Sequence, residues 1–244
     1  MPAQPGDSRK SKWPKNLPPL TEEQQRIAAD FMDYWLEVLP KRFSLIERYN
    51  HGYPVRASAK GPLTTLEIGA GRGEHLLYED LSPAQQKNYY ALDSRDCMRR
   101  EVRERFPQVN VVTADCQRRL PFPDGFFDRV LAIHVLEHLP DLPSAIREAH
   151  RVCKKTGSFI VVIPCEGGLL YGLARRISAR RIFERRYKQS YQWFIEHEHI
   201  NIPAEIIEEL RACFRIVEQS FYPVPLPFEW CNLSIGLKLV PQST

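Results

Sequence analysis

The fold is decided by the stretch Leu63-Thr64-Thr65-Leu66-Glu67-Ile68-Gly69-Ala70-Gly71-Arg72-Gly73-Glu74-His75-Leu76. Its first residues are mostly apolar or β-branched and predict a strand. Three glycines follow at alternate positions and predict a turn, after which we expect a helix that runs to about Asp80. A glycine turn lets the backbone approach a ligand closely, and the amide groups at a helix N-terminus attract anions. The stretch therefore predicts a loop that holds a nucleotide cofactor.

After this loop, apolar runs alternate with helical segments. The expected strands are 89–93, 109–115, 129–134 and 157–163, and the expected helices are 95–106 and 142–152. Strands that are apolar on both faces and separated by helices predict a parallel sheet covered on both sides. A helix that begins at Pro203 and two strands, 215–221 and 231–239, are expected to complete the domain.

Composition limits the class of protein. The 244 residues suffice for one α/β domain with additions, and 43% apolar and 26% charged residues are typical of a globular protein. The six cysteines include no C-x-x-C pair, which argues against a zinc module or a disulfide framework. No apolar run reaches the roughly 18–20 residues that span a bilayer. We therefore expect a cytoplasmic protein without a transmembrane segment, whose net charge of +4 permits an anionic partner.

Three regions are expected along the chain. Residues 1–20, rich in proline and basic residues, predict a flexible basic tail. Residues 21–58 predict a helical cover that begins with a capping box of Thr21 and Gln24 and contains a second helical piece before His51. Residues 59–244 form the main domain, with an insertion at 166–202. Tyr34 in the cover either lines a substrate pocket or packs in the core.

The glycine loop and one later carboxylate indicate the cofactor. The form Glu67-x-Gly69-x-Gly71-x-Gly73 resembles the first motif of class I S-adenosylmethionine (SAM) methyltransferases. Dinucleotide enzymes have G-x-G-x-x-G with a small sixth residue that allows close helix packing, whereas Glu74 stands at the sixth position here. Asp93 lies at the end of the expected second strand, where a carboxylate can accept both hydroxyls of a ribose, although a helix N-cap is the alternative.

The resemblance implies further roles. Asp115 would accept the adenine amino group, the backbone at Cys116 would meet the ring, and the backbone near His134 would meet the methionine amino group. The stretch His134-Val135-Leu136-Glu137-His138 is close to the family's H-x-L-E-H. The expected cofactor-binding residues are Glu67, Gly69, Ala70, Gly71, Gly73, Asp93, Ser94, Asp115, Cys116 and His134. The implied fold is a doubly wound, seven-stranded, mostly parallel sheet with an antiparallel last strand, an N-terminal helical cover and an inserted helical lid.

The insertion is expected to determine the acceptor. One of its faces is apolar, and the other carries several arginines. Such a basic face either binds an anionic membrane surface or an anionic acceptor, or is merely solvated, and the sequence supports the two interpretations about equally. We expect Tyr34, Tyr171, Arg175 and Tyr191 to contact the substrate. His197 and His199 share one side of an expected extended loop, and His199 is the predicted general base. Metal binding by both histidines and a plain polar loop are the alternatives.

No metal site is predicted. His134 and His138 stand four residues apart with Glu137 between them, but no third ligand stands at a suitable spacing.

The predicted function is SAM-dependent O-methylation of a small or lipid-linked, anionic or neutral acceptor such as a sugar or a metabolite. The partners expected are that acceptor and a peripheral membrane surface, with nucleic acid less favoured. The alternatives are a tRNA or protein methyltransferase and a non-catalytic binding module that keeps the SAM fold.

Overall fold

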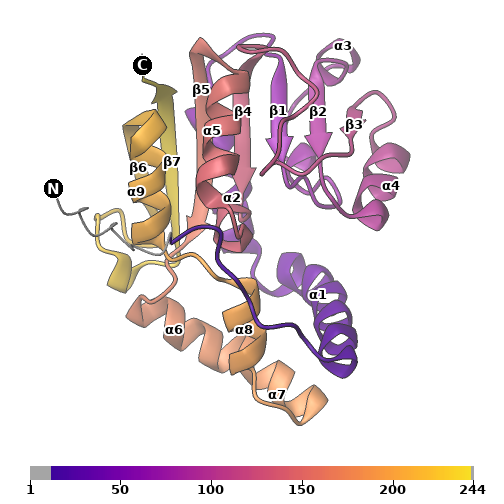
Figure 1. Ribbon diagram of the computed structural model, residues 1–244, viewed down its shortest axis with the longest axis vertical. Coiled ribbons are helices and arrows are strands. Elements are labelled where there is room, and N and C mark those ends of the chain that lie inside the picture. The colour runs from indigo at the N-terminus through magenta and orange to yellow at the C-terminus, as the bar shows by residue number, and fades with distance from the viewer. Residues whose placement is uncertain (1–11, 243–244) are drawn as a thin grey trace, which may run out of the picture.

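The computed structural model describes residues 12–242, and its centre is a seven-stranded sheet (Figure 1). The strand order is β3-β2-β1-β4-β5-β7-β6. The strands are β1 (Thr65–Ile68), β2 (Tyr89–Leu92), β3 (Asn110–Val112), β4 (Phe127–Ile133), β5 (Cys153–Pro164), β6 (Phe214–Tyr222) and β7 (Ser234–Pro241). β7 pairs antiparallel with β5 and β6, and the other neighbouring pairs are parallel. The predicted doubly wound sheet with an antiparallel last strand is confirmed.

Helices cover both faces of the sheet and one of its ends. They are α1 (Glu22–Arg42), α2 (Ser44–Ala57), α3 (Pro83–Gln86), α4 (Asp96–Arg105), α5 (Leu142–Val152), α6 (Leu169–Arg175), α7 (Arg181–Tyr187), α8 (Gln192–Glu198) and α9 (Pro203–Cys213). Short helical turns are η1 (His75–Leu77), η2 (Leu136–His138), η3 (Arg176–Arg180) and η4 (Glu229–Cys231). In Figure 1, α5 and α9 lie in front of the sheet and α2 behind it, while α1 and α6–α8 lie beyond its lower end.

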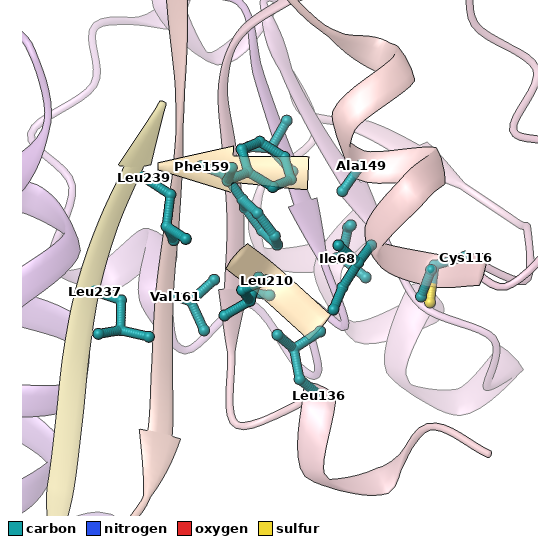
Figure 2. Packing of buried hydrophobic residues seen from close by; sticks show 14 of the residues in the cluster. Ile68, Cys116, Leu136, Ala149, Phe159, Val161, Leu210, Leu237 and Leu239 are labelled. Atoms are coloured by element: carbon teal, nitrogen blue, oxygen red, sulfur yellow. The ribbon is translucent and has the colours of Figure 1, made fainter. Parts of the chain in front are cut away.

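Alternate residues of the central strands enter two separate cores, because successive side chains of a strand point to opposite faces. Phe159, Val161 and Ile163 of β5 pack with α5 and α9, and Figure 2 shows Val161 between Leu237 and Leu210, with Leu239 beside Phe159. Ile160 and Val162 pack on the other face, in the cluster that contains Tyr49 and Tyr53 of α2. Burial on both faces explains why the sequence of β5 reads as a continuous apolar run.

Two local predictions are wrong. The helix expected to run to about Asp80 is only the short turn η1, which ends at Leu77. Gly71 and Gly73 have φ angles of 54° and 81°, outside the right-handed helical region, so the helix cannot begin before them either. The second piece of the cover does not end before His51, since α2 continues through Gly52 and Pro54 to Ala57. Packing overrides propensity there: the Tyr53 ring fills the space above Gly236, where a Cβ would lie 2.4 Å from it.

The cover and the insertion pack against each other. The ring of Phe31 in α1 meets those of Phe183 and Phe194 edge to face, with centroids 5.0 and 5.2 Å apart. These aromatic residues form a third apolar cluster that includes Tyr191. The capping box is confirmed, because the Thr21 amide donates to Gln24 Oε1 at 3.0 Å and the Gln24 amide to Thr21 Oγ1 at 3.2 Å. One roof of helices therefore closes the end of the sheet.

The predicted tail lies partly outside the described part of the chain, which begins at residue 12. In the part of the tail that is described, Lys15 Nζ donates to Glu205 Oε2 of α9 at 2.6 Å and to the Ile200 carbonyl at 2.7 Å. Among residues 12–242, no helix is both long and apolar enough to cross a bilayer.

Candidate cofactor and acceptor site

A cavity of about 920 Å³ lies between the carboxyl ends of the strands and the roof of helices. Its floor is the glycine loop with the residues that follow β2, β3 and β4, and its roof comes from α1, α2, α6 and α8. β1 and β4 are neighbours in the sheet, and the chain leaves them in opposite directions, which is where doubly wound sheets bind ligands. The volume of the cavity falls in the range of about 300–1,000 Å³ that is typical of small-molecule sites.

Glycine is required in the loop for two reasons. Gly69 has φ 71°, and a Cβ there would lie 2.3 Å from a methyl group of Val135. Gly73 has φ 81°, and its Cβ would lie 2.9 Å from the Phe106 ring. Gly69, Ala70 and Gly71 line the cavity, whereas Gly73 does not and instead allows the loop to pack against Phe106. The loop is therefore both a cavity wall and a packing surface.

Asp93 is a buried carboxylate at the end of β2 that lines the cavity and already has donors. Its Oδ2 accepts from the Gly71 amide at 3.1 Å, and its Oδ1 accepts from the Arg95 amide at 2.9 Å. The Arg95 guanidinium also donates to both oxygens, at 3.1 and 3.2 Å. A ribose diol that binds this carboxylate therefore has to displace the Arg95 side chain, 48% of whose surface is exposed.

The other expected cofactor residues also line the cavity. Ser94, Asp115 and Cys116 follow β2 and β3 there, and Asp115 Oδ1 accepts from the Gln117 amide at 2.9 Å. Burial raises the pKa of the Cys116 thiol to about 12, so this sulfur is not a nucleophile. His134 has φ 52°, a conformation rare for a residue with a side chain and common at functional sites.

Glu67 lines the cavity floor as a protonated acid. Its carboxyl group is buried and accepts one hydrogen bond, from the Tyr89 hydroxyl at 2.8 Å. Burial raises the pKa of Glu67 to about 8, against the smaller opposing effect of that hydrogen bond. At neutral pH the group is therefore mostly uncharged.

A polar cluster of Glu137, His138 and His199 also lines the cavity, and we call this part of it the cluster wall. Glu137 Oε1 pairs with His134 Nδ1 at 3.1 Å. His138 Nδ1 lies 2.6 Å from the Glu198 carbonyl oxygen, and His199 Nδ1 lies 2.9 Å from Glu166 Oε2. The rings of His138 and His199 meet edge to face, with centroids 5.1 Å apart.

Backbone contacts hold His199 in this place. The amides of Ile200 and Asn201 donate to the Glu137 carbonyl at 2.9 and 3.1 Å. The Asn201 side chain donates to the carbonyls of Leu136 and Leu139, both at 2.8 Å, and is fully buried. The end of the insertion is thus bound to the turn η2, which fixes His199 relative to Glu137 and His138.

The electrostatics of the cluster favour an ionised carboxylate at Glu137. Burial alone would raise the pKa of Glu137, but the hydrogen bond from His134 and the nearby rings of His138 and His199 lower it to about 2. Burial lowers the pKa of His138, and the nearby Glu137 opposes this effect only in part. The pKa of Glu166 is also lowered, because the His199 hydrogen bond and charge and the nearby Arg175 outweigh its burial.

The residues predicted to contact substrate are only partly brought together. Tyr171, Arg175 and Tyr191 line the cavity, but Tyr34 does not, and Arg186 instead stacks on its ring at 5.0 Å. His197 lies in α8 rather than in an extended loop and does not line the cavity, so it does not share a side with His199. Helix formation in 192–198 replaces the two-residue repeat on which that prediction depended.

Some residues of the site were missed from the sequence. His138, Glu166 and the apolar wall of Phe31, Trp35 and Phe43 line the cavity or orient its groups. The position of Glu166 directly after β5, at the carboxyl edge of the sheet, was the signal that could have indicated it.

Known proteins share this domain. A family model described as a methyltransferase domain matches residues 66–161. The chain carries a class I SAM-dependent methyltransferase domain. This domain is similar to a Mycobacterium tuberculosis protein whose name reads "probable S-adenosylmethionine-dependent methyltransferase", with 31% identity over 145 residues, 59% of this chain and 48% of that protein. The chain thus spans about half the length of that curated relative.

Two further likenesses concern the sequence and the fold of this domain. The malonyl-[acyl-carrier protein] O-methyltransferase of Halorhodospira halophila is 32% identical over 116 residues, 47% of this chain and 37% of that protein. A crystal structure of a Pyrococcus horikoshii protein has a TM-score of 0.60 at 16% identity, covering 86% of this chain and 99% of that one, and it supports the fold.

The cofactor of this domain family is SAM, and the cavity suits it. A buried carboxylate at the end of β2 matches a ribose diol, and the carboxylate of Asp115 matches an amino donor. The Nε2 atom of His134, which also lines the cavity, is buried and has no hydrogen-bond partner among the described residues. The donors and acceptors present therefore fit the group.

Proposed function

We propose that this protein transfers the methyl group of SAM to an oxygen atom of a small or lipid-linked acceptor. The observation that carries the proposal is that one cavity joins the glycine loop, Asp93 and Asp115 to the cluster of Glu137, His138 and His199. An acceptor on the cluster wall would share an enclosed space with the cofactor, and positioning supplies much of the catalysis in such a displacement.

The expected chemistry needs a proton acceptor. The acceptor oxygen attacks the sulfonium methyl carbon, the carbon–sulfur bond breaks with its electrons on sulfur, and the hydroxyl proton has to leave. In the metal-free protein we expect His199 Nε2 to take this proton, because the other nitrogen of the ring is held by Glu166 at 2.9 Å. An amine acceptor would not need such a group, so the cluster favours oxygen.

The lid surface supports an acceptor linked to a lipid. Leu169, Leu173 and Ile177 recur at four-residue spacing on the outside of α6 and η3, with 76%, 56% and 66% of their surfaces exposed. The adjoining turn η4 exposes Phe228 and Trp230. Exposed apolar side chains beside arginines are typical of surfaces that rest on a membrane, where such an acceptor would be found.

Internal pairing weakens the expectation of an anionic acceptor. Arg175 pairs with Glu166, Arg180 with Glu184 and Arg186 with Asp30, so these three arginines already have carboxylate partners. An uncharged acceptor is therefore favoured for the cavity itself, while the basic outer face of the lid suits an anionic bilayer.

A transfer assay tests the proposal. Protein and SAM labelled in the methyl group are incubated with fractionated cell lipids and, separately, with water-soluble metabolites. We expect label in a lipid fraction. Treatment of the product with alkali then distinguishes a methyl ether, which is stable, from a methyl ester, which is cleaved. Calorimetry with SAM is run in parallel. Absence of SAM binding would refute the proposal, and label in tRNA or protein instead would favour the alternative acceptors.

A further inference from the structure

We propose that Glu137, His138 and His199 form a binding site for one divalent transition-metal cation on the cluster wall of the cavity. Each residue offers one ligand atom, and these three atoms lie within 4.8 Å of one another. Ligands bound at about 2.1 Å in a tetrahedron lie about 3.4 Å apart, so the three groups need to close by up to about 1.4 Å on binding the cation. The role given to this cation rests on the proposed function, but its binding does not.

The hydrogen bonds leave one nitrogen of each histidine ring available for a cation. The Glu198 carbonyl oxygen can only accept, so His138 Nδ1, 2.6 Å away, must carry the proton. The ionised Glu166 carboxylate likewise accepts from His199 Nδ1. In a neutral ring, Nε2 then keeps its lone pair. Histidine ligands of metals usually donate their second nitrogen to a carbonyl or a carboxylate in this way.

The third group brings a negative charge that lacks a full set of partners. Glu137 is fully buried, and its Oε2 atom has no hydrogen-bond partner among the described residues. Its Oε1 atom pairs with His134 Nδ1 and lies 3.9 Å from His138 Nε2. A buried carboxylate oxygen without a donor is costly, and a cation would compensate it.

The ligand set indicates the kind of cation. Two imidazoles and one carboxylate favour zinc and its neighbours in the first transition series over magnesium or calcium, which prefer oxygen ligands. Three protein ligands facing a cavity leave at least one coordination position for another molecule. The side chains of His138 and His199 are 33% and 17% exposed, which leaves this side open to the cavity.

That open position would hold the acceptor. Coordination of its hydroxyl oxygen lowers the pKa of the hydroxyl group, and the proton is released to water. The oxygen then attacks the methyl carbon of SAM, and the electrons of the broken carbon–sulfur bond stay on sulfur. With the cation bound, His199 is a ligand, and this replaces its direct role as a base.

Cobalt absorption tests the binding. The protein is stripped with a chelator and titrated with Co²⁺, whose visible bands report coordination, and Zn²⁺ is then added as a competitor. We expect bands that saturate at one equivalent and disappear with Zn²⁺. Because cysteine thiolates also bind these ions, the variants decide. Loss of a residue that only orients a metal ligand typically weakens metal binding roughly 10–100-fold. We expect the Co²⁺ affinity of Glu166→Ala to fall by an amount within this range, and that of His199→Gln and of His138→Gln to fall by more.

The control is His197→Gln, two residues from His199 on the lid but outside the cavity lining. It should bind Co²⁺ as the wild type does. Circular dichroism of every variant reports folding, and SAM calorimetry reports cofactor binding separately. Equal loss in His197→Gln and His199→Gln, or the lack of a one-equivalent transition in a protein that binds SAM, would overturn the metal site. Histidine-dependent Co²⁺ binding in a protein that does not bind SAM would preserve the site and defeat the proposed function.

Discussion

The two halves of the cavity are built by different means. The cofactor half, which comprises the glycine loop, Asp93 and Asp115, comes from the ends of adjacent strands of one sheet. The acceptor half, which comprises Glu137, His138, Glu166 and His199, brings η2 together with both ends of the insertion. The first needs only the local rules of strand ends and glycine turns. The second exists only once the lid has docked.

The two halves also differ in the pKa of a buried glutamate that each contains. Burial raises the pKa of Glu67 in the cofactor half to about 8, where it has the Tyr89 hydroxyl as donor. The pKa of Glu137 in the acceptor half falls to about 2 despite burial, because His134 donates to it and two further histidines lie near. Similar burial thus gives a neutral acid in one half and a carboxylate in the other.

The largest effect is expected from Asp93→Ala, which should weaken SAM binding at least about 100-fold, since hydrogen bonds to a charged group contribute about 1.5–3 kcal/mol each. Each hydrogen bond of the ribose to Asp93 is expected to contribute the lower end of this free-energy range, because the ribose must first displace the Arg95 side chain. Calorimetry measures the affinity, and Asp96→Asn, three residues along and outside the cavity lining, is the control. Wild-type affinity in Asp93→Ala would mean that the ribose is bound elsewhere.

The acceptor half can be loosened without touching the cofactor half. Asn201→Ala leaves the carbonyls of Leu136 and Leu139 without this donor, which should cost about 2–3 kcal/mol of stability. We expect methyl transfer to fall about tenfold or more while SAM affinity stays near the wild-type value, because His199 loses its anchor. Urea unfolding, calorimetry and the transfer assay measure the three quantities.

Asn110→Ala is the matched control for that variant. Asn110 also donates its amide to two carbonyls, those of Lys87 and Tyr89, but it lies at β3 and does not line the cavity. It should lose stability and keep its transfer rate at temperatures where it is folded. If SAM affinity and transfer fell together in Asn201→Ala, the two halves would not be independent.

The sequence predicts the cofactor half better than the acceptor half for a physical reason. Strand ends such as Asp93 and Asp115 are marked by apolar runs and polar stops that are adjacent in the chain. The meeting of His199 with Glu137 joins residues about 60 apart, and no local pattern encodes it. The same reason explains why the sequence indicated no third metal ligand. Propensity failed where packing decided, as in the continuation of α2 through Pro54.

The last effect concerns the pH dependence of stability and comes from Glu67→Gln. A folded-state pKa of about 8, above the ordinary 4.5, means that the native protein binds more protons than the unfolded chain between these values. The stability that Glu67 contributes is therefore complete below pH 4.5 and is lost as the pH rises to 8, at up to about 1.4 kcal/mol per pH unit. The glutamine side chain of this variant cannot titrate but can still accept the Tyr89 hydrogen bond.

The comparison of the two glutamates makes this variant informative. Glu137 is shifted the other way, so its contribution is constant above pH 4.5 and is lost only as the pH falls toward 2. The lowered pKa of buried His75 and of His138 makes stability rise with pH up to about 6.5 in both proteins, and this cancels in the difference. Urea midpoints between pH 5 and 8 should therefore fall more steeply in the wild type than in Glu67→Gln, with exposed Glu104→Gln as the control. Parallel curves would show that Glu67 is charged in the native protein, and its burial beside Tyr89 would then need a cationic partner.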